Sequence, residues 1–502
     1  MTISAKPSTP TTPTVPADRI CCLNRHAPRE DGQYVLYWMT AYRRVTSNYA
    51  LQHAAEWAGR LKKPLLILEG LQADYRWSSP RFHHFVADGM KENARVTQAS
   101  NTAYYPYIEP TPAAGKGLLR KLSQQACLLV TDDYPCFFLP ELQEYCSRLD
   151  TLSLAVDSNG ILPMRHADKT YTTAYSFRRF LQKELRPFLA ESPSETPLAA
   201  SLPSATLQDL VDQPTRERYP AFTADEAAFQ SILQPGATLD STVAPTPLRG
   251  GSTPAQQLLT AFLRDRLAHY IERNHPDDDA QSHLSPYLHF GHISAHQILT
   301  QLLAQYPWTL NELSATTKGS RSGWWNLPPE AEGFLDQLIT WREIGFNMCF
   351  RMPDYTSYDS LPNWALETLQ AHADDPRPVT YSSTELESAC TEDPLWNACQ
   401  HQLATDGFIH NYLRMLWGKK ILQWAQHPRD ALDTMIHLNN KYALDGRDPN
   451  SYSGIFWVLG RYDRAWGPER SIFGKVRYMT SENTRRKLRL KSYLERYQSP
   501  AT

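Results

Sequence analysis

Three tryptophans in the last quarter of the chain are the residues whose spacing most directly suggests a chemistry. Trp417 and Trp424 are seven residues apart in the run Trp417-Gly-Lys-Lys-Ile-Leu-Gln-Trp424, so they would lie on nearly the same face of an α-helix. Trp396 precedes this run, and Asp445-Gly-Arg-Asp-Pro-Asn450 follows it. Indoles gathered in one helical region favour light-driven or redox electron transfer over hydrolysis. The alternative, from spacing alone, is that they are core packing residues.

Two polar segments are candidate binding motifs. Ser282-His283-Leu284-Ser285, followed by Pro286, opens a predicted helix, where hydroxyls and backbone amides can bind a diphosphate. Ser-Pro also begins many helices for purely structural reasons. Asp445, Arg447 and Asn450 fall in a turn-rich segment, where Asp and Asn side chains often satisfy only local backbone groups.

Five apolar runs with helix-like stretches between them precede residue 160. Such runs indicate buried parallel strands joined by crossover helices. The sequence therefore predicts a doubly wound, Rossmann-like parallel α/β domain over residues 31–186. Its crevice, at the carboxyl ends of the strands, is a place for a small chromophore, although no G-x-G-x-x-G phosphate loop is present. The predicted strands are 34–39, 64–71, 103–108, 126–131 and 152–157.

The rest of the chain has a different character. Nine prolines among many Ser, Thr and Ala residues predict a long linker over 187–250. Helical periodicity in 255–273, 294–305, 332–350 and 407–426 predicts an all-helical C-terminal domain over 251–502. The first 30 residues, rich in Thr, Pro and Ser and without a signal-peptide core, are expected to be a disordered tail.

Composition narrows the functional class. A chain of 502 residues with 41% hydrophobic content suits two or three globular units. Eight cysteines without CxxC spacing argue against a zinc ribbon or a disulfide framework. No apolar run is long enough to span a membrane. We expect a protein of the cytoplasm, associated with the nucleoid if it is bacterial. We also expect a monomer.

Charge is unevenly distributed along the chain. The formal net charge of −2 gives no global nucleic-acid signature. From residue 461 onward, however, eleven Lys and Arg residues face four Asp and Glu residues. This basic region is suited to contacts with phosphates, and the alternative is a solvated terminal helix.

Together these motifs resemble the photolyase/cryptochrome flavoproteins, most closely the class II cyclobutane pyrimidine dimer photolyases. The resemblance implies an α/β antenna-type domain followed by a helical FAD-binding catalytic domain. It implies a lyase that splits pyrimidine dimers in DNA by electron transfer from photoexcited, reduced FAD. Other segments that carry the resemblance are Tyr37-Trp38-Met39, Leu284 to Ser294, Asp393 to Ala398, Asn440-Lys441-Tyr442 and Phe473 to Met479.

The resemblance also implies the cofactor and its contacts. FAD is expected, and an antenna chromophore of the deazaflavin or folate type is left open. Asn450 would face flavin N5 and favour the reduced state, and Trp417, Trp396 and Trp424 would run in that order from the flavin toward solvent. No metal is expected. The implied FAD contacts are Tyr270, Ser282, His283, Leu284, Ser285, Arg342, Asn347, Arg414, Asp445, Arg447 and Asn450.

The implied lesion pocket departs from the family at two positions. Gln337 stands where photolyases usually have a Glu; an amide donates a hydrogen bond at any pH, whereas a carboxyl group donates only when protonated. Asn411 stands where class II enzymes tend to have Gly, and it shares a helix face with Met415. Trp341 and Trp466 would stack on the extruded bases. The implied partner is UV-damaged DNA with a flipped pyrimidine dimer.

Two other functions fit the same motifs. Gln337 favours a cryptochrome-like blue-light receptor without repair activity, because a receptor has no dimer to stabilise. The second alternative is a flavoenzyme that acts on another photoproduct. The retained Trp341, Asn411, Met415 and Trp466 favour repair.

Overall fold

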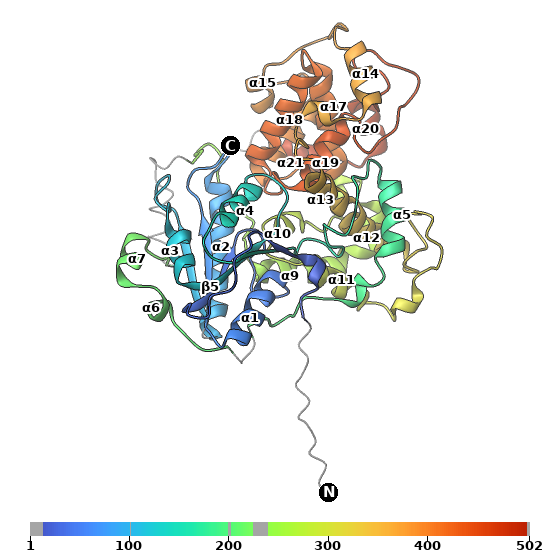
Figure 1. The fold of residues 1–502 in the computed structure, drawn as a ribbon. Coiled ribbons are helices and arrows are strands. Elements are labelled where there is room, and N and C mark those ends of the chain that lie inside the picture. Colours follow the sequence, from blue (N-terminus) through green and yellow to red (C-terminus); the bar gives the residue numbers. More distant parts are fainter. Residues whose placement is uncertain (1–13, 101, 199–201, 224–238, 499–502) are drawn as a thin grey trace.

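The computed structural model describes residues 14–100, 102–198, 202–223 and 239–498 (Figure 1). Its N-terminal part is built on a six-stranded sheet with the strand order β1-β6-β5-β2-β3-β4. All neighbouring strands are parallel except β1 and β6, which pair antiparallel. The five predicted strands are confirmed. The strands are β1 (Ile20–Cys22), β2 (Tyr34–Met39), β3 (Leu65–Leu71), β4 (Ala103–Ile108), β5 (Ala126–Asp132) and β6 (Ser153–Val156).

Both faces of this sheet are covered, which explains why its strands read as continuous apolar runs. Side chains alternate between two cores along β2, where Val35 and Tyr37 belong to one cluster and Leu36 to the other. Helix α1 (Tyr49–Leu61) packs on the first face and α3 (Leu118–Gln125) on the second. The predicted doubly wound α/β fold is therefore confirmed.

The predicted disordered tail is wrong for its described part, residues 14–30. β1 pairs with β6 and forms the edge of the sheet, so main-chain hydrogen bonds fix a three-residue segment that was too short to give a strand signal. The buried Arg19 guanidinium donates to the carbonyls of Gly160 and Ile161 at 3.2 and 2.7 Å. Its Cζ also lies 4.5 Å from the centre of the Tyr49 ring. Residues 1–13 of the predicted tail lie outside the described residues.

The described residues of the predicted linker include two short helices and pack on the α/β part. Two short helices, α6 (Leu207–Leu210) and α7 (Gln213–Arg218), begin at the capping residues Thr206 and Asp212. Val211 and Tyr219 are buried beside the α3 face of the sheet. The segments at 199–201 and 224–238 lie outside the described residues.

The C-terminal part is helical, and no strand follows β6 in the described residues. Helices α12, η7 and α13 are consecutive, and η7 is a π-helical turn between two α-helices. Helix α5 (Ala174–Glu184) of the preceding segment packs on η7. The helices that matter below are α10 (Ser285–His289), α12 (Pro329–Leu335), η7 (Asp336–Trp341), α13 (Arg342–Arg351), α16 (Pro394–Asp406), α17 (Asn411–Trp424), α18 (Pro428–Tyr442) and α19 (Pro449–Val458).

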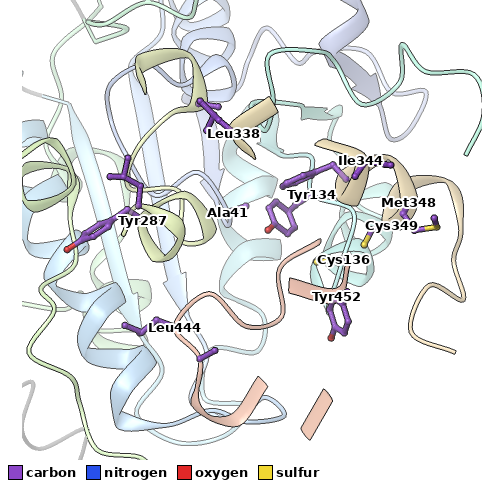
Figure 2. Close-up of a cluster of buried hydrophobic side chains, with 14 of the residues drawn as sticks. Ala41, Tyr134, Cys136, Tyr287, Leu338, Ile344, Met348, Cys349, Leu444 and Tyr452 are labelled. Carbon is purple, nitrogen blue, oxygen red and sulfur yellow. The ribbon is translucent and has the colours of Figure 1, made fainter. Parts of the chain in front are cut away.

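Apolar and polar contacts join the sheet to α13. Tyr134 and Cys136, which follow β5, lie beside Ile344 and Cys349 of α13 in one buried cluster (Figure 2). One core cluster therefore runs through both parts of the molecule.

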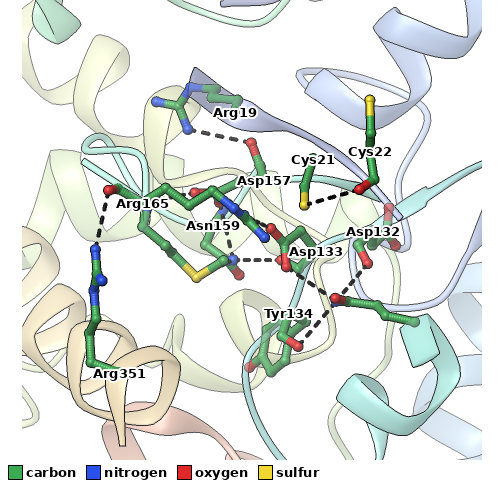
Figure 3. A network of polar contacts seen from close by, with 12 residues as sticks. Arg19, Cys21, Cys22, Asp132, Asp133, Tyr134, Asp157, Asn159, Arg165 and Arg351 are labelled. Atoms are coloured by element: carbon green, nitrogen blue, oxygen red, sulfur yellow. Dashed lines mark hydrogen bonds and ion pairs between the residues drawn. The ribbon is translucent and has the colours of Figure 1, made fainter. Parts of the chain in front are cut away.

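The loops after β5 and β6 are fixed by a polar network (Figure 3). Asp133 pairs with Arg165, and the Asn159 amide donates to the Asp133 carbonyl at 2.9 Å and to the Asp157 carboxylate at 3.1 Å. Arg351, at the end of α13, donates to the Arg165 carbonyl at 3.4 Å. The helical part is thereby tied to the edge of the sheet.

Glu343 of α13 makes another buried connection. Its carboxylate accepts the Ile161 and Leu162 backbone N–H groups at 2.7 and 3.2 Å. Burial raises the pKa of Glu343 from 4.5 to about 7, although these hydrogen bonds and the neighbouring Arg342 oppose the shift.

We predict that Glu343→Gln makes the free energy of unfolding less dependent on pH. The folded protein keeps this proton up to about pH 7, whereas the unfolded chain releases it near pH 4.5. The folded state therefore binds more protons in this interval, and stability falls as pH rises through it, by up to about 1.4 kcal/mol per pH unit. Urea unfolding measures this slope, which Glu343→Gln should flatten and the exposed Glu367→Gln should not. Equal slopes for all three proteins would contradict the assignment.

Candidate active site

A cavity of about 1100 Å³ gathers all five predicted lesion-pocket residues and two of the predicted cofactor residues. It is bounded by η7, α17 and α19, with α5 and the C-terminal segment at its rim. The predicted residues that line it are Gln337, Trp341, Asn411, Arg414, Met415, Asn450 and Trp466.

The π-helical turn η7 presents two adjacent polar side chains with different surroundings. Asp336 is bound by both arms of Arg178, with Nε–Oδ1 and Nη2–Oδ2 distances of 2.7 and 2.9 Å. Among the described residues, the Gln337 amide makes no hydrogen bond. The Asp336 carboxylate is thus neutralised, and Gln337 is left available to a ligand. π-Helical turns occur frequently at functional sites because they displace side chains from the regular helical positions.

Two tryptophans lie in contact with each other in the wall of this cavity. The rings of Trp341 and Trp457 have their centres 5.8 Å apart and their planes at 47°. Sequence reasoning missed Trp457, which follows Asn450 by seven residues on α19. Trp417 and Trp424 have the same spacing, which places two side chains on one helix face. The sequence therefore contained the information needed to place Trp457 on the same face as Asn450.

Trp466 lies at the rim of the cavity. It is 36% exposed, and the guanidinium carbons of Arg464 and Arg477 lie 4.8 and 4.9 Å from its ring centre. Its indole N–H donates to Asp463 at 3.1 Å. Trp341 and Trp466, which were predicted together as stacking residues, therefore differ in position. Trp341 lies inside the cavity, and Trp466 lies at its edge.

An ion pair closes one side of the cavity. Nη2 of Arg414 lies 3.2 Å from the Asp445 carboxylate, which also accepts the Ser285 hydroxyl at 2.8 Å. Nε of Arg414 is buried and has no partner among the described residues. This orphaned donor beside a large cavity fits a polar cofactor, and a hydroxyl and a carboxylate stand next to it.

Asp448 fixes the segment that carries Asn450. Its carboxylate accepts the Asn450 backbone N–H at 2.8 Å, which caps α19, and the Tyr134 hydroxyl at 2.9 Å. Burial alone would raise the pKa of Asp448, but His289, 3.6 Å away, and other partners hold it below its usual value. A charged acceptor therefore sets the position of Asn450 on the cavity wall.

Arg447 does not line this cavity. Its backbone has a positive φ of 61°, so the chain reverses there and the side chain turns toward the sheet. The guanidinium carbon lies 3.6 Å from the centre of the Phe82 ring. The structure thus separates Arg447 from Asn450, although the sequence grouped them.

Several other predicted cofactor residues are engaged within the protein. Arg342 donates to the Asn159 carbonyl at 2.9 Å, and Asn347 bonds the Tyr171 N–H and the Lys169 carbonyl. Both hold loops of the α/β part, and neither lines the cavity. Tyr270, Ser282, His283 and Leu284 also lie outside its lining: Tyr270 packs on Phe262 and Phe334, and His283 pairs with Asp279.

A second cavity of about 670 Å³ lies at the carboxyl ends of the strands, as predicted. Trp38, Leu71 and Tyr107 line it from the sheet, and His289 and Arg447 line it from the helical part. The segment from Asp445 to Asn450 therefore borders both cavities.

Of the three tryptophans, Trp417 and Trp424 belong to α17 and Trp396 belongs to α16, and all three are buried. Trp417 follows Arg414 by one turn of α17, and its indole N–H donates to Gln400 at 3.0 Å. The Trp396 N–H donates to the Trp417 carbonyl at 3.0 Å, and the Trp396 and Trp424 ring centres are 5.3 Å apart. Trp396 thus contacts both other tryptophans, through the Trp417 backbone carbonyl and through the Trp424 ring, and Trp417 lies one helical turn from Arg414 in the cavity wall.

Trp424 differs from its predicted place near solvent. It is only 3% exposed, because Tyr381 packs against its ring with centres 5.1 Å apart. The Lys420 ammonium lies 4.7 Å from the ring centre and 3.4 Å from Asp393.

Comparison with known proteins identifies the family. The chain is 35% identical over 483 residues to the deoxyribodipyrimidine photo-lyase of Methanothermobacter thermautotrophicus, covering 96% of this chain and 98% of that protein. The chain belongs to the deoxyribodipyrimidine photo-lyase family. The Arabidopsis thaliana photo-lyase is 31% identical, covering 92% and 88% of the two chains. No protein-family model matches the sequence.

The fold agrees with this membership. A class III photolyase from Agrobacterium tumefaciens superimposes with a TM-score of 0.66 at 16% identity, covering 93% of this chain and 86% of that one. The photo-lyase fold expected from the sequence is confirmed. In the described part of the photo-lyase chain, no group of three or more His, Cys, Asp or Glu side chains is placed to hold a metal. Its described helices include none with the length and apolar character needed to cross a membrane.

We predict that Arg178→Met lowers the free energy of unfolding by about 3–5 kcal/mol, because it leaves the Asp336 carboxylate buried without its partner. Denaturant unfolding measures the change. The exposed Arg179→Met provides the matched control. Replacing the pair together, with Arg178→Met and Asp336→Leu, should restore much of the loss. A single variant as stable as the control would show that the pair does not hold η7.

Proposed function

We propose that this protein repairs DNA in light, splitting cyclobutane pyrimidine dimers with FAD as its cofactor. The observation that carries the proposal is a single cavity with two indoles in its wall, with amides that make no hydrogen bond among the described residues, and with buried tryptophans one helical turn away. Family membership supports the repair reaction, and this geometry supports the dimer as the lesion.

Bound FAD would supply, on absorption of light, the electron that opens the cyclobutane ring. Arg414 and Asp445 suit its polar portion, because the Arg414 Nε donor is buried and has no hydrogen-bond partner in the described part of the chain. The Asn450 side chain would orient the flavin edge from the start of α19, where Asp448 fixes its backbone.

Trp341 and Trp457 are placed to stack on the extruded pyrimidines. Stacking on an aromatic side chain contributes about 1–3 kcal/mol per base. Gln337 and Asn411 line the same cavity, and their amide N–H groups suit the carbonyl oxygens of a dimer. Because amides do not titrate, this pocket would hold the lesion without a protonated carboxyl group.

The rim of the cavity suits the DNA strand. Three of the four exposed large hydrophobic residues in the described chain, Tyr175, Trp466 and Tyr478, line this cavity. Exposed aromatic rings that cluster at one opening indicate a binding surface. Arg321, Arg464, Arg477 and Lys487 line the same cavity and suit the phosphates.

The second cavity suits an antenna chromophore. It is formed by the carboxyl ends of parallel strands, the usual place for a ligand in such a sheet. Its aromatic lining, including Trp38 and Tyr107, favours a planar ring, and the buried Arg447 favours an oxygen-bearing one.

The alternative of a light receptor without repair is supported by Gln337, since a receptor needs no group that stabilises a dimer. The clustered aromatic and basic rim favours repair over that alternative.

We predict that the reduced holoenzyme restores thymine monomers from a thymine-dimer oligonucleotide under blue light. Its rate should vary little across neutral pH, because Gln337 does not titrate. Gln337→Glu should preserve or raise repair. Gln337→Ala removes a hydrogen bond of about 1 kcal/mol, so lesion affinity should fall roughly fivefold.

Chromatography of the irradiated oligonucleotide measures repair, and titration in the dark measures lesion affinity. Gln305→Ala, an exposed glutamine outside the cavity, is the control. Tight lesion binding without recovery of monomers would favour the receptor reading. A large loss of repair in Gln337→Glu would mean that the pocket is built around the amide.

We predict that Trp417→Phe slows photoreduction of the oxidised holoenzyme and leaves the chemically reduced enzyme competent in repair. The reason is that Trp417 is the first indole beyond the cavity wall, whereas dimer splitting does not use the tryptophan path. Absorption under steady blue light measures photoreduction. Photoreduction of Trp417→Phe at the parent rate would exclude this residue from the path.

A further inference from the structure

A lysine is buried beneath the end of α19 that carries Trp457. Lys419 of α17 is 2% exposed, and its ammonium donates to the carbonyl of Val458, the last residue of α19. The neighbouring Gly418 leaves no room for a larger residue, because a Cβ there would lie 2.6 Å from the Val458 side chain and 2.9 Å from Met435 of α18. The helices are thus closely packed beside the ammonium, and its charge is kept from water.

This cation lies where the end of a helix favours one. The last carbonyls of an α-helix have no partner within the helix, and a positive charge near them is stabilising. The Val458 carbonyl is one of these. Trp457, whose ring lies in the wall of the main cavity, directly precedes it. The Lys419 ammonium therefore fixes the turn of α19 that presents this indole.

The same charge acts on the segment that follows α19. Asp463 attracts the Lys419 ammonium, and Arg477 repels it. The Asp463 carboxylate accepts the indole N–H of Trp466 at 3.1 Å and the Arg464 backbone N–H at 2.9 Å. Asp463 thus links the buried cation to the aromatic ring at the rim of the cavity.

Burial makes this charge sensitive to pH. It lowers the pKa of Lys419 from 10.5 to about 7, with Asp463 opposing the shift and Arg477 adding to it. A neutral amine is a weaker hydrogen-bond donor than an ammonium group, and it no longer attracts Asp463. Both interactions are therefore strongest below pH 7 and weaken as pH rises through this value.

We propose that Lys419 is a positioning residue for lesion binding, and that the form with a charged ammonium binds the lesion more tightly. The ammonium holds the last turn of α19, with Trp457, and acts through Asp463 on Trp466. DNA phosphates at the rim strengthen this preference, because a nearby anion favours the charged form. Lesion binding above pH 7 then takes up a proton from solvent onto the Lys419 amine. This inference rests on the proposed function.

Titration of the holoenzyme in the dark with a thymine-dimer oligonucleotide tests the proposal. The dissociation constant of the parent should rise about fivefold between about pH 6 and pH 8.5, since a charged hydrogen bond is exchanged for a neutral one. Lys419→Met has a similar length and no charge, so its constant should already be raised at the lower pH and should not change further. Lys121→Met, which removes a partly exposed lysine of α3, should match the parent.

Two further measurements distinguish positioning from a general effect of charge. Undamaged oligonucleotide of the same sequence should show a smaller pH dependence, because its stacked bases do not reach Trp457. The rate of dimer splitting in the saturated complex should stay flat with pH in the parent and in Lys419→Met, because Lys419 does not line the cavity. A pH dependence equal for damaged and undamaged DNA would overturn the positioning role.

The outcomes separate this inference from the proposed function. A parent protein that neither prefers the dimer nor repairs it would overturn the proposed function. Preferential binding with the same pH dependence in the parent and in Lys419→Met would overturn the role of Lys419 alone. Calorimetry of the parent in buffers with different heats of ionisation counts the protons exchanged, and it needs no variant. Uptake of part of a proton at about pH 7.5 is expected, and lesion binding without proton uptake would also overturn the role of Lys419.

Discussion

The buried Asp448 carboxylate is the interaction on which the two cavities depend. It accepts one hydrogen bond from the start of α19 and another from Tyr134, next to the sheet, while His289 stands 3.6 Å away. Because these partners come from three separate parts of the chain, one charged group fixes their relative positions. Removing its charge would leave several buried donors unsatisfied at once, which costs more than losing a single surface hydrogen bond.

The main cavity combines fixed charges at its edges with neutral groups at its centre. Arg178 neutralises Asp336, and Asp445 lies beside Arg414, so each carboxylate near the cavity floor has a cation. Gln337 and Asn411 then supply directional hydrogen bonding without adding charge. With this arrangement, no uncompensated carboxylate stands at the cavity floor, where an electron-rich ligand would bind. The basic side chains Arg321, Arg464, Arg477 and Lys487 lie at the rim.

The sequence predicted the elements whose signal is local. Strands β2 to β6 are apolar on both faces, and the indole spacing in α17 follows the helical repeat, so both were readable. β1 was missed because its stability comes from pairing with a distant strand. The side-chain directions of three residues could not be predicted from the sequence. A positive φ determines that of Arg447, and contacts with loops more than a hundred residues away determine those of Arg342 and Asn347. Trp457 could have been predicted from its seven-residue spacing to Asn450.

The reversal of the backbone at Arg447 has a geometric consequence. Arg447 and Asn450 are three residues apart, yet they belong to opposite cavities. Covalent geometry therefore restricts the separation between the two cavity walls that carry these residues. In the proposed function these cavities hold FAD and an antenna chromophore, and excitation transfer between chromophores depends steeply on their distance and orientation. The optical coupling of the two sites would then survive changes elsewhere that alter stability.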